Sequence, residues 1–257
     1  MKTAVGPQQM AEDIRQNVGY FDMHESLSLG NSDSQHQVFF GRMPDLADDL
    51  IAVKPFTKVA RAKGEFHALQ TVAERDIDTI EPLSFAVGGV ASYLFTRYRP
   101  GLTNLGTVDW RVDIANPRLQ HELTPAIQAS ALAAAGWHDK GVGHGDYQLK
   151  NSIFTLNADP VFADAERTTF HKAPAEFTPA ANKDIMKLGR SMLSRGLLYD
   201  KSPSYRTGFL NETLLGAYFD ALRADRYDMS PEERKQAIEA YWTEAIGKQQ
   251  SVVEAKS

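Results

Sequence analysis

The stretch from residue 1 to residue 100 alternates short apolar runs with turn-rich segments. This pattern is typical of antiparallel strands joined by hairpins. Gly88-Gly89 separates the last two apolar runs and is a tight-turn signal. The pattern predicts five antiparallel strands, at residues 26–29, 37–40, 50–53, 83–87 and 90–98.

A helix is predicted between the third and the fourth of these strands. The apolar residues of this segment recur at helical spacing, with charged residues between them. One face of such a helix packs on a sheet while the other meets water. The apolar positions are Val59, Ala62, Phe66, Leu69 and Val72.

Beyond Pro100-Gly101 the pattern becomes mainly helical. Ser230 precedes a proline and is followed three residues later by Glu233, which is a capping-box arrangement for the last helix. Two short strands flank a turn at residues 157–160. The strands are predicted at residues 153–156 and 161–163, and the helices at 123–137, 184–198, 212–223 and 231–246.

These elements predict an α+β chain of two lobes. Residues 1–100 form an N-terminal lobe with a five-stranded antiparallel sheet and one helix. Residues 101–257 form a mainly helical C-terminal lobe. A cleft between two such lobes is a natural place for a ligand.

Composition narrows the possible functions of the 257-residue chain. The net charge of -5 argues against broad nucleic-acid binding. The absence of cysteine excludes disulfides, zinc thiolate sites and a cysteine nucleophile. No run approaches the roughly 20 apolar residues that span a bilayer, and no signal peptide is recognisable, so we expect a cytoplasmic protein. The oligomeric state stays open.

The main chemical signal lies at residues 144–151. His144-Gly145-Asp146 with Asn151 fits the spacing His-x-Asp-x-x-x-x-Asn, which is the pattern of a kinase catalytic loop. An acceptor hydroxyl needs a carboxylate to orient it and to take its proton, which is the predicted role of Asp146. A triphosphate needs a metal clamp, to which Asn151 would contribute. We interpret His144 as structural.

A second carboxylate follows at Asp164, just after the predicted strand at residues 161–163. A hairpin between Asn151 and Asp164 would bring both side chains together as Mg²⁺ ligands, and two oxygen ligands are what Mg²⁺ usually takes from protein. Glu166 is either a further metal contact or, as we favour, the partner of a nearby arginine or lysine.

Upstream, Ile51-Ala52-Val53-Lys54 resembles the Val-Ala-Ile-Lys strand of protein kinases. Lys54 is the predicted phosphate-binding lysine, with Lys58 as an alternative. Glu65, in the helix that follows, is predicted to pair with Lys54 and fix its position.

The ordered set of Lys54, Glu65, His144-Gly145-Asp146, Asn151 and Asp164 resembles the protein-kinase-like superfamily. It is similar to the atypical branch, which includes RIO-type kinases, lipopolysaccharide-core sugar kinases and aminoglycoside or choline phosphotransferases. The resemblance implies a bilobal kinase fold that uses ATP and Mg²⁺.

The same resemblance assigns further residues. Tyr98 and Arg99 would lie at the hinge against the adenine. The turn that begins at Gly30 would take the place of a glycine-rich loop, although it lacks the Gly-x-Gly-x-x-Gly pattern. The helix around Asp184 would anchor the catalytic loop from below.

The acceptor is a choice between alternatives. Asp164-Ala165-Glu166 replaces Asp-Phe-Gly, and only a short segment separates Asp164 from Asp184, so a long activation loop is not expected. We therefore favour a small-molecule or sugar hydroxyl. The alternatives are a RIO-like serine/threonine protein kinase, a pseudokinase that binds without turnover, and an unrelated fold in which the motifs are coincidental.

Overall fold

The computed structural model describes residues 6–29, 38–106, 117–155, 159–172, 174–194, 198, 201–223 and 227–254, with side chains at most of these positions. Packing divides the chain into two compact units. The first unit comprises Met1–Gly101 and Phe162–Glu166, and the second comprises Leu102–Val161 and Arg167–Ser257. The chain therefore passes from one unit to the other three times.

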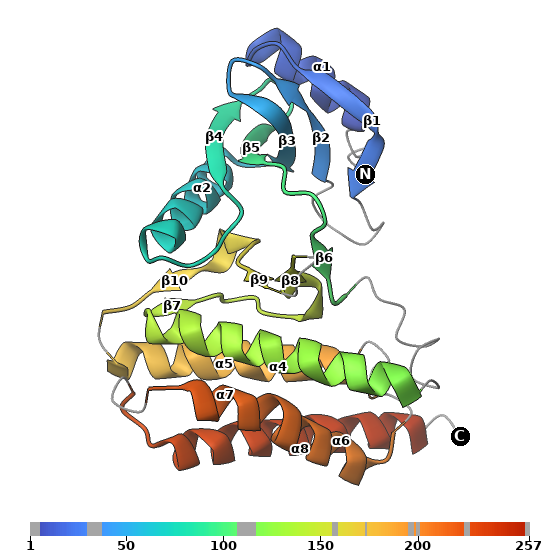
Figure 1. Ribbon diagram of the computed structural model, residues 1–257, viewed down its shortest axis with the longest axis vertical. Helices are drawn as coiled ribbons and strands as arrows, with labels where there is room; N and C mark the ends of the chain where they lie inside the picture. Colours follow the sequence, from blue (N-terminus) through green and yellow to red (C-terminus); the bar gives the residue numbers. More distant parts are fainter. Residues whose placement is uncertain are drawn as a thin grey trace. The chain divides into compact units, whose positions relative to one another are not determined.

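The first unit is built on a five-stranded antiparallel sheet with the strand order β1-β2-β3-β5-β4 (Figure 1). This confirms the predicted number and direction of the strands, although several begin or end elsewhere than expected. A helix connects β3 to β4, and β4 lies at the edge of the sheet. The next strand, β5, then lies between β3 and β4 and is antiparallel to both. The strands are β1 (Asp22–Leu29), β2 (Val38–Met43), β3 (Ala47–Phe56), β4 (Pro82–Val87) and β5 (Ser92–Arg97).

Two helices belong to the first unit. The predicted helix is confirmed as α2 (Val59–Glu74), which packs on β4 and β5. The other helix, α1 (Pro7–Asn17), was not predicted, so the expectation of one helix in this lobe was wrong. Its apolar stripe is short, and a buried Asp13 lies beside the buried Ala11 and Ile14.

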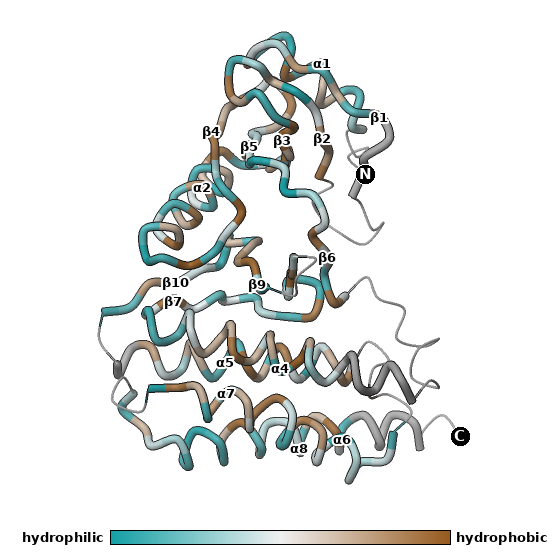
Figure 2. Tube along the Cα trace, in the orientation of Figure 1, coloured by the Kyte–Doolittle hydropathy of each residue, from teal (hydrophilic) through white to brown (hydrophobic). Residues whose placement is uncertain are grey.

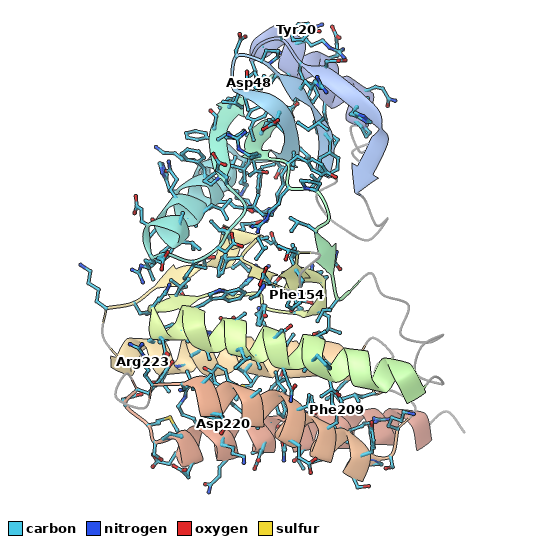
Figure 3. The ribbon with its side chains drawn as sticks, in the orientation of Figure 1. Tyr20, Asp48, Phe154, Phe209, Asp220 and Arg223 are labelled. Atoms are coloured by element: carbon cyan, nitrogen blue, oxygen red, sulfur yellow. The ribbon has the colours of Figure 1, made fainter. Side chains whose placement is uncertain are left out.

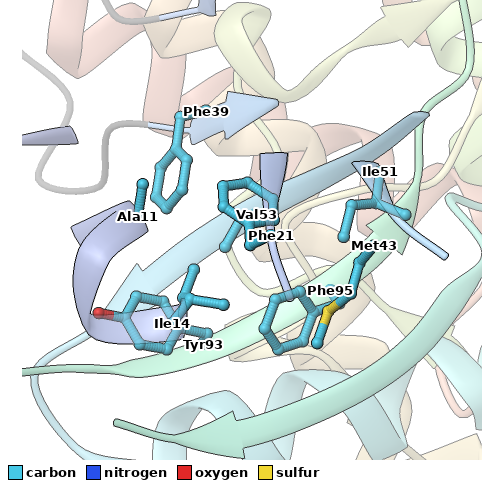
Figure 4. Packing of buried hydrophobic residues seen from close by; sticks show 9 residues of the cluster. All are labelled: Ala11, Ile14, Phe21, Phe39, Met43, Ile51, Val53, Tyr93 and Phe95. Carbon is cyan, nitrogen blue, oxygen red and sulfur yellow. The ribbon is translucent and has the colours of Figure 1, made fainter. Parts of the chain in front are cut away.

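The side chains of α1 complete a core on one face of the sheet (Figure 4). Val53 and Tyr93 are fully buried there, and Phe21 and Phe39 meet edge to face with ring centroids 5.8 Å apart. Burying each such side chain stabilises the fold by about 1.5–3 kcal/mol. Because side chains alternate along a strand, Val53 facing this core turns the neighbouring Lys54 to the opposite face.

The second unit is mainly helical, as predicted, and its last helix begins with the predicted capping box. Ser230 Oγ accepts a hydrogen bond from the Glu233 amide at 3.2 Å, and the Ser230 amide donates to Glu233 Oε2 at 2.9 Å. Figure 2 shows that α4 is apolar along most of its described length, whereas α8 is more hydrophilic. The helices are α4 (Pro117–Asp139), α5 (Pro174–Ser194), α6 (Pro203–Phe209), the π-helical η3 (Leu210–Leu215), α7 (Gly216–Ala221) and α8 (Pro231–Glu254).

The helix predicted at residues 184–198 begins earlier in the structure, at Pro174, and the helix predicted at residues 212–223 differs in both its start and its regularity. The latter helix begins at Pro203, where Ser202 caps it by accepting a hydrogen bond from the Tyr205 amide. It then passes through the π-helical turn of η3 before α7. A wide turn of this kind shifts the helix face and cannot be read from a regular apolar period.

Short strands and turns connect the helices of the second unit. The predicted pairing after the catalytic loop is confirmed, since β8 and β9 are antiparallel, and Phe154 of β8 is buried (Figure 3). The remaining elements are β6 (Thr103–Asn104), β7 (Val142–Gly143), η1 (Leu149–Asn151), β8 (Ile153–Phe154), β9 (Pro160–Val161), η2 (Ala165–Arg167) and β10 (Thr169–Phe170). Among the described residues, no helix is both long enough and apolar enough to cross a bilayer.

Candidate active site

An ammonium group held by two carboxylates lies in the first unit. Lys54 Nζ donates to Glu65 Oε1 at 3.0 Å, to Glu65 Oε2 at 2.8 Å and to Asp164 Oδ1 at 2.6 Å. The predicted ion pair between Lys54 and Glu65 is thus formed, with Glu65 only 2% exposed. Lys58, the alternative lysine, is exposed at the N-terminus of α2.

The carboxylates dominate the electrostatics of this cluster. Burial lowers the pKa of Lys54, but the attraction of Glu65 and Asp164 outweighs burial, so the pKa is raised and the ammonium stays charged. Burial raises the pKa of Glu65, and repulsion from Asp164 adds to it, against the opposing effect of Lys54. Two carboxylates facing one ammonium leave a formal charge of about -1. The cluster is therefore suited to a further cation.

Glu166, next to this cluster, is bound to an arginine. Arg61 of α2 donates from Nε to Glu166 Oε1 at 2.5 Å and also forms an ion pair with it. This confirms the predicted preference for a basic partner. The Asp164 side chain is 34% exposed, whereas the Glu166 side chain is 19% exposed.

The segment that carries Asp164 is fixed to the first unit by backbone hydrogen bonds. The Phe162 amide donates to Asp78 O at 2.8 Å, and the Ile80 amide donates to Phe162 O at 3.1 Å. Asp164 itself has φ +55°, a left-handed conformation that costs a non-glycine residue about 1–3 kcal/mol. Strained backbone of this kind is typical of functional positions, where surrounding contacts hold it in place.

The loop at residues 144–151 belongs to the second unit and is anchored on α5. Asp184 accepts from the His144 amide at 2.6 Å and from the Gly145 amide at 2.8 Å. Ser191, two turns further along α5, accepts from the Leu149 amide at 3.0 Å. The anchoring helix expected around Asp184 is therefore confirmed.

Gly145 allows the sharp turn at the start of this loop. It has φ +76°, and a Cβ at this position would overlap the carbonyl oxygen of Arg167. Only glycine meets both conditions without strain. The residue that distinguishes this loop from His-Arg-Asp is thus required by local packing.

Asp146 meets a lysine that the sequence reasoning missed. Lys187 Nζ lies 2.9 Å from Asp146 Oδ1 and donates to Gly145 O at 2.5 Å. Arg167 Nη1 is 3.9 Å from the same Oδ1. The sequence feature that could have identified Lys187 is its position one helical turn after Asp184, because this places both residues on the same face of α5.

Asn151 closes the loop. Its Nδ2 donates to Asp146 O at 2.8 Å, and the residue is 6% exposed. With the amide nitrogen used in this way, the side-chain oxygen is the atom available to a metal ion. Asn151 belongs to the second unit and Asp164 to the first, so their joint role as Mg²⁺ ligands stays a prediction.

Asp184 is connected to α8 by a buried polar chain. His138 Nε2 lies 3.3 Å from Asp184 Oδ2, and His138 Nδ1 lies 2.6 Å from the Tyr218 hydroxyl, to which Arg234 Nη2 donates at 2.9 Å. Burial lowers the pKa of His138, against the opposing effect of Asp184. Burial raises the pKa of Asp184, but the hydrogen bond and the attraction of His138, together with the His144 backbone, outweigh burial and lower it. These contacts connect the residue that anchors the loop at 144–151 to α8.

His144 has the structural role expected for it. It is fully buried, and its ring packs near the rings of Trp137 and Tyr147 at centroid distances of 6.2 and 5.4 Å. These contacts hold the loop against α4.

The predicted hinge residues make contacts inside the first unit. The Tyr98 amide donates to Leu50 O at 2.9 Å, and Arg99 Nη1 donates to both carboxylate oxygens of Asp78 at 2.8 and 2.9 Å. The adenine contacts expected of Tyr98 and Arg99 stay predictions. Gly30 lies outside the described residues.

Known proteins resemble the chain at the level of the fold. No protein-family model and no curated protein matches its sequence. The solved structure titled "WaaP in complex with acyl carrier protein" superposes with a TM-score of 0.56 at 18% identity, covering 93% of this chain and 92% of that chain. The PknI kinase domain of Mycobacterium tuberculosis gives a TM-score of 0.48 at 17% identity, covering 88% of this chain and 98% of that one. The chain has an α+β, protein-kinase-like fold.

Proposed function

We propose that the protein is an ATP- and Mg²⁺-dependent phosphotransferase that phosphorylates a hydroxyl group. The observation that carries this proposal is the contact of Lys54 with Glu65 and Asp164. In kinases, the lysine on the third strand has to be paired with a helix glutamate before it can hold the nucleotide phosphates. The first unit has this pair in place.

The proposed step transfers the terminal phosphoryl group of ATP. Asp146 accepts the proton of the acceptor hydroxyl as the acceptor oxygen bonds to the terminal phosphorus. The bond between that phosphorus and the bridging oxygen breaks, and ADP leaves. Asp146 then releases the proton to solvent, and the carboxylate is restored.

The residues assigned to Mg²⁺ fit its chemistry. Asn151 offers an amide oxygen, and Asp164 offers a partly exposed carboxylate in a cluster with excess negative charge. Among the described residues, no group of three or more histidines and acidic residues could hold a metal by itself. Bound Mg²⁺ would neutralise charge on the phosphates, which is the usual reason that such sites keep only one or two protein ligands.

The short segment between Asp164 and α5 supports a small acceptor. Only residues 165–173 separate Asp164 from the start of α5, and η2 and β10 occupy part of this segment. A peptide substrate usually requires a longer segment to hold it in an extended form. We therefore favour a small-molecule or sugar hydroxyl over serine or threonine in a protein.

Transfer from labelled ATP tests the proposal. The acceptors are galactose, kanamycin and casein, with release of inorganic phosphate to water measured alongside. Wild type should transfer label in the presence of Mg²⁺ and lose this activity in EDTA. Asp146→Asn should lower kcat by about 10²- to 10⁴-fold, the usual contribution of general-base catalysis.

Asp220→Asn is the matched control, because Asp220 is an exposed aspartate in α7 (Figure 3). It should keep the wild-type rate. Equal and negligible turnover in wild type and Asp146→Asn would refute the enzyme and leave a nucleotide-binding module. Label found on casein alone would overturn the preference for a small acceptor.

A further inference from the structure

The two oxygens of the Asp146 carboxylate have different surroundings. Oδ1 is 2.9 Å from Lys187 Nζ and 3.9 Å from Arg167 Nη1. In the part of the chain that the structure describes, no side chain or backbone amide is bonded to Oδ2. Within the described residues, Oδ1 is thus bound by Lys187, whereas Oδ2 accepts from no protein donor.

Lys187 is held in place from two sides. Its ammonium donates to Gly145 O at 2.5 Å as well as to Asp146 Oδ1, so it bridges the peptide that links these residues. The rest of α5 fixes its position, because Asp184 and Ser191 bind the same loop from the same helix face. A charged donor that is anchored in this way restricts both the backbone and the side chain of Asp146.

We propose that Lys187 is a positioning residue that orients Asp146 so that Oδ2 faces the acceptor hydroxyl. This inference rests on the proposed phosphotransfer and names the residue on which its proton-transfer geometry depends. Lys187 turns Asp146 so that one oxygen is occupied and the other receives the proton. A carboxylate that rotates freely would present either oxygen to the acceptor hydroxyl and would be aligned with it only in a fraction of the molecules. A misplacement of about 1 Å can lower the rate by about 10²-fold.

Arg167 does not take this role. Its side chain is 64% exposed, and it approaches Asp146 only at 3.9 Å, beyond hydrogen-bond length. Lys187 is 25% exposed and within hydrogen-bond distance. An exposed pair of the Arg167 kind contributes little, whereas the partly buried Lys187 contact is directional.

Substitutions at Lys187 test the proposal with the same acceptor panel and with water as acceptor. Lys187→Met should lower kcat by about 10- to 10²-fold with an unchanged KM for ATP, and its melting temperature is measured alongside. Lys187→Arg should recover most of this loss, because a guanidinium keeps the charge and two donors. Lys183→Met is the matched control, since Lys183 is exposed on the same helix, and it should behave as wild type.

A double-mutant cycle separates positioning from a general structural effect. If Lys187 acts through the Asp146 carboxylate, adding Lys187→Met to Asp146→Asn should lower the residual rate by less than about 2-fold. A full additional loss in the double variant would overturn the proposal. If Lys187→Met does not fold, Lys187→Arg decides: a rate as low as that of Asp146→Asn would overturn it as well.

The experiment distinguishes this inference from the proposed function. Active wild type together with fully active Lys187→Met would refute the role of Lys187 and leave the phosphotransferase standing. Wild type without turnover toward any acceptor or water would refute the phosphotransferase, and the role of Lys187 with it.

Discussion

The Tyr93 hydroxyl donates a hydrogen bond of 2.5 Å to Asp13 Oδ2 and thereby joins α1 to the sheet. The same carboxylate accepts from the Gly89 amide at 2.6 Å and from the Val90 amide at 3.2 Å, so it also fixes the turn between β4 and β5. Asp13 is 5% exposed. A helix that the sequence did not reveal is therefore attached through one buried acid.

Asp13→Ala should destabilise the first unit by about 1–3 kcal/mol, the usual cost of removing the partner of one buried polar group. The substitution removes the acceptor of the buried Tyr93 hydroxyl, whereas Gly89 and Val90 are exposed, so water can replace the bonds of their amides. Urea unfolding measures the loss. Glu12→Gln on the same helix is the control, because Glu12 is 54% exposed and its ion pair with Arg15 contributes little to the free energy of unfolding. Equal stability of the two variants would contradict the anchoring role.

The contribution of Asp13 should depend on pH. Burial raises its pKa, but hydrogen bonds from Tyr93, Val90, Gly89 and Asn17 outweigh burial, and the pKa is lowered. With a folded-state pKa below the unfolded one, the stabilisation is present above the unfolded value and is lost as the pH falls through the folded value. The difference in unfolding free energy between wild type and Asp13→Asn should therefore be large at pH 7 and shrink as the pH is lowered below about 4. A difference that is constant with pH would show that ionisation of Asp13 is irrelevant.

Glu65→Gln should weaken the use of ATP. The neutral amide no longer attracts Lys54, which then pairs with Asp164 alone, and we expect kcat/KM for ATP to fall by about 10²-fold. Initial rates at varied ATP concentration measure the effect. Glu74→Gln, at an exposed position of the same helix, should leave kcat/KM unchanged. An active Glu65→Gln would remove the main support for the proposed function.

Gly145→Ala and Gly136→Ala should have opposite effects on stability. Gly145 has φ +76° and no room for a Cβ, so alanine there should cost about 1–3 kcal/mol and lower the rate. Gly136 lies inside α4 with nothing within 4 Å of an added Cβ, and alanine there should stabilise by up to about 1 kcal/mol. Thermal unfolding compares the pair. A stable and active Gly145→Ala would show that the loop conformation is not constrained as described.

The sequence predicted elements that depend on local signals. The sheet followed from apolar alternation and from turns such as Gly88-Gly89, and the pairing of Lys54 with Glu65 followed from their order on a strand and a helix. The helix α1 was missed because a buried Asp13 resembles a solvent-facing residue. Its partners, Tyr93 and the turn after β4, lie far along the chain.

The candidate site shows the same limit. Residues with a motif, such as Asp146 and Asn151, were named from spacing alone. Lys187 has no motif, and only its helical phase relative to Asp184 separates it from the exposed Lys183. The buried chain from Asp184 to Arg234 depends on contacts between helices that are distant in sequence, which no local pattern specifies.

The chain passes between the units three times, and this limits which fragments of the protein can keep the Lys54 site. A fragment that ended at Gly101 would lack Phe162–Glu166, and with it Asp164, one of the two carboxylates that hold Lys54. Its residues Asp78 and Thr79 would also lose their bonds to Phe162. An expressed fragment that preserves the lysine site therefore has to include Phe162–Glu166 as well as the residues up to Gly101.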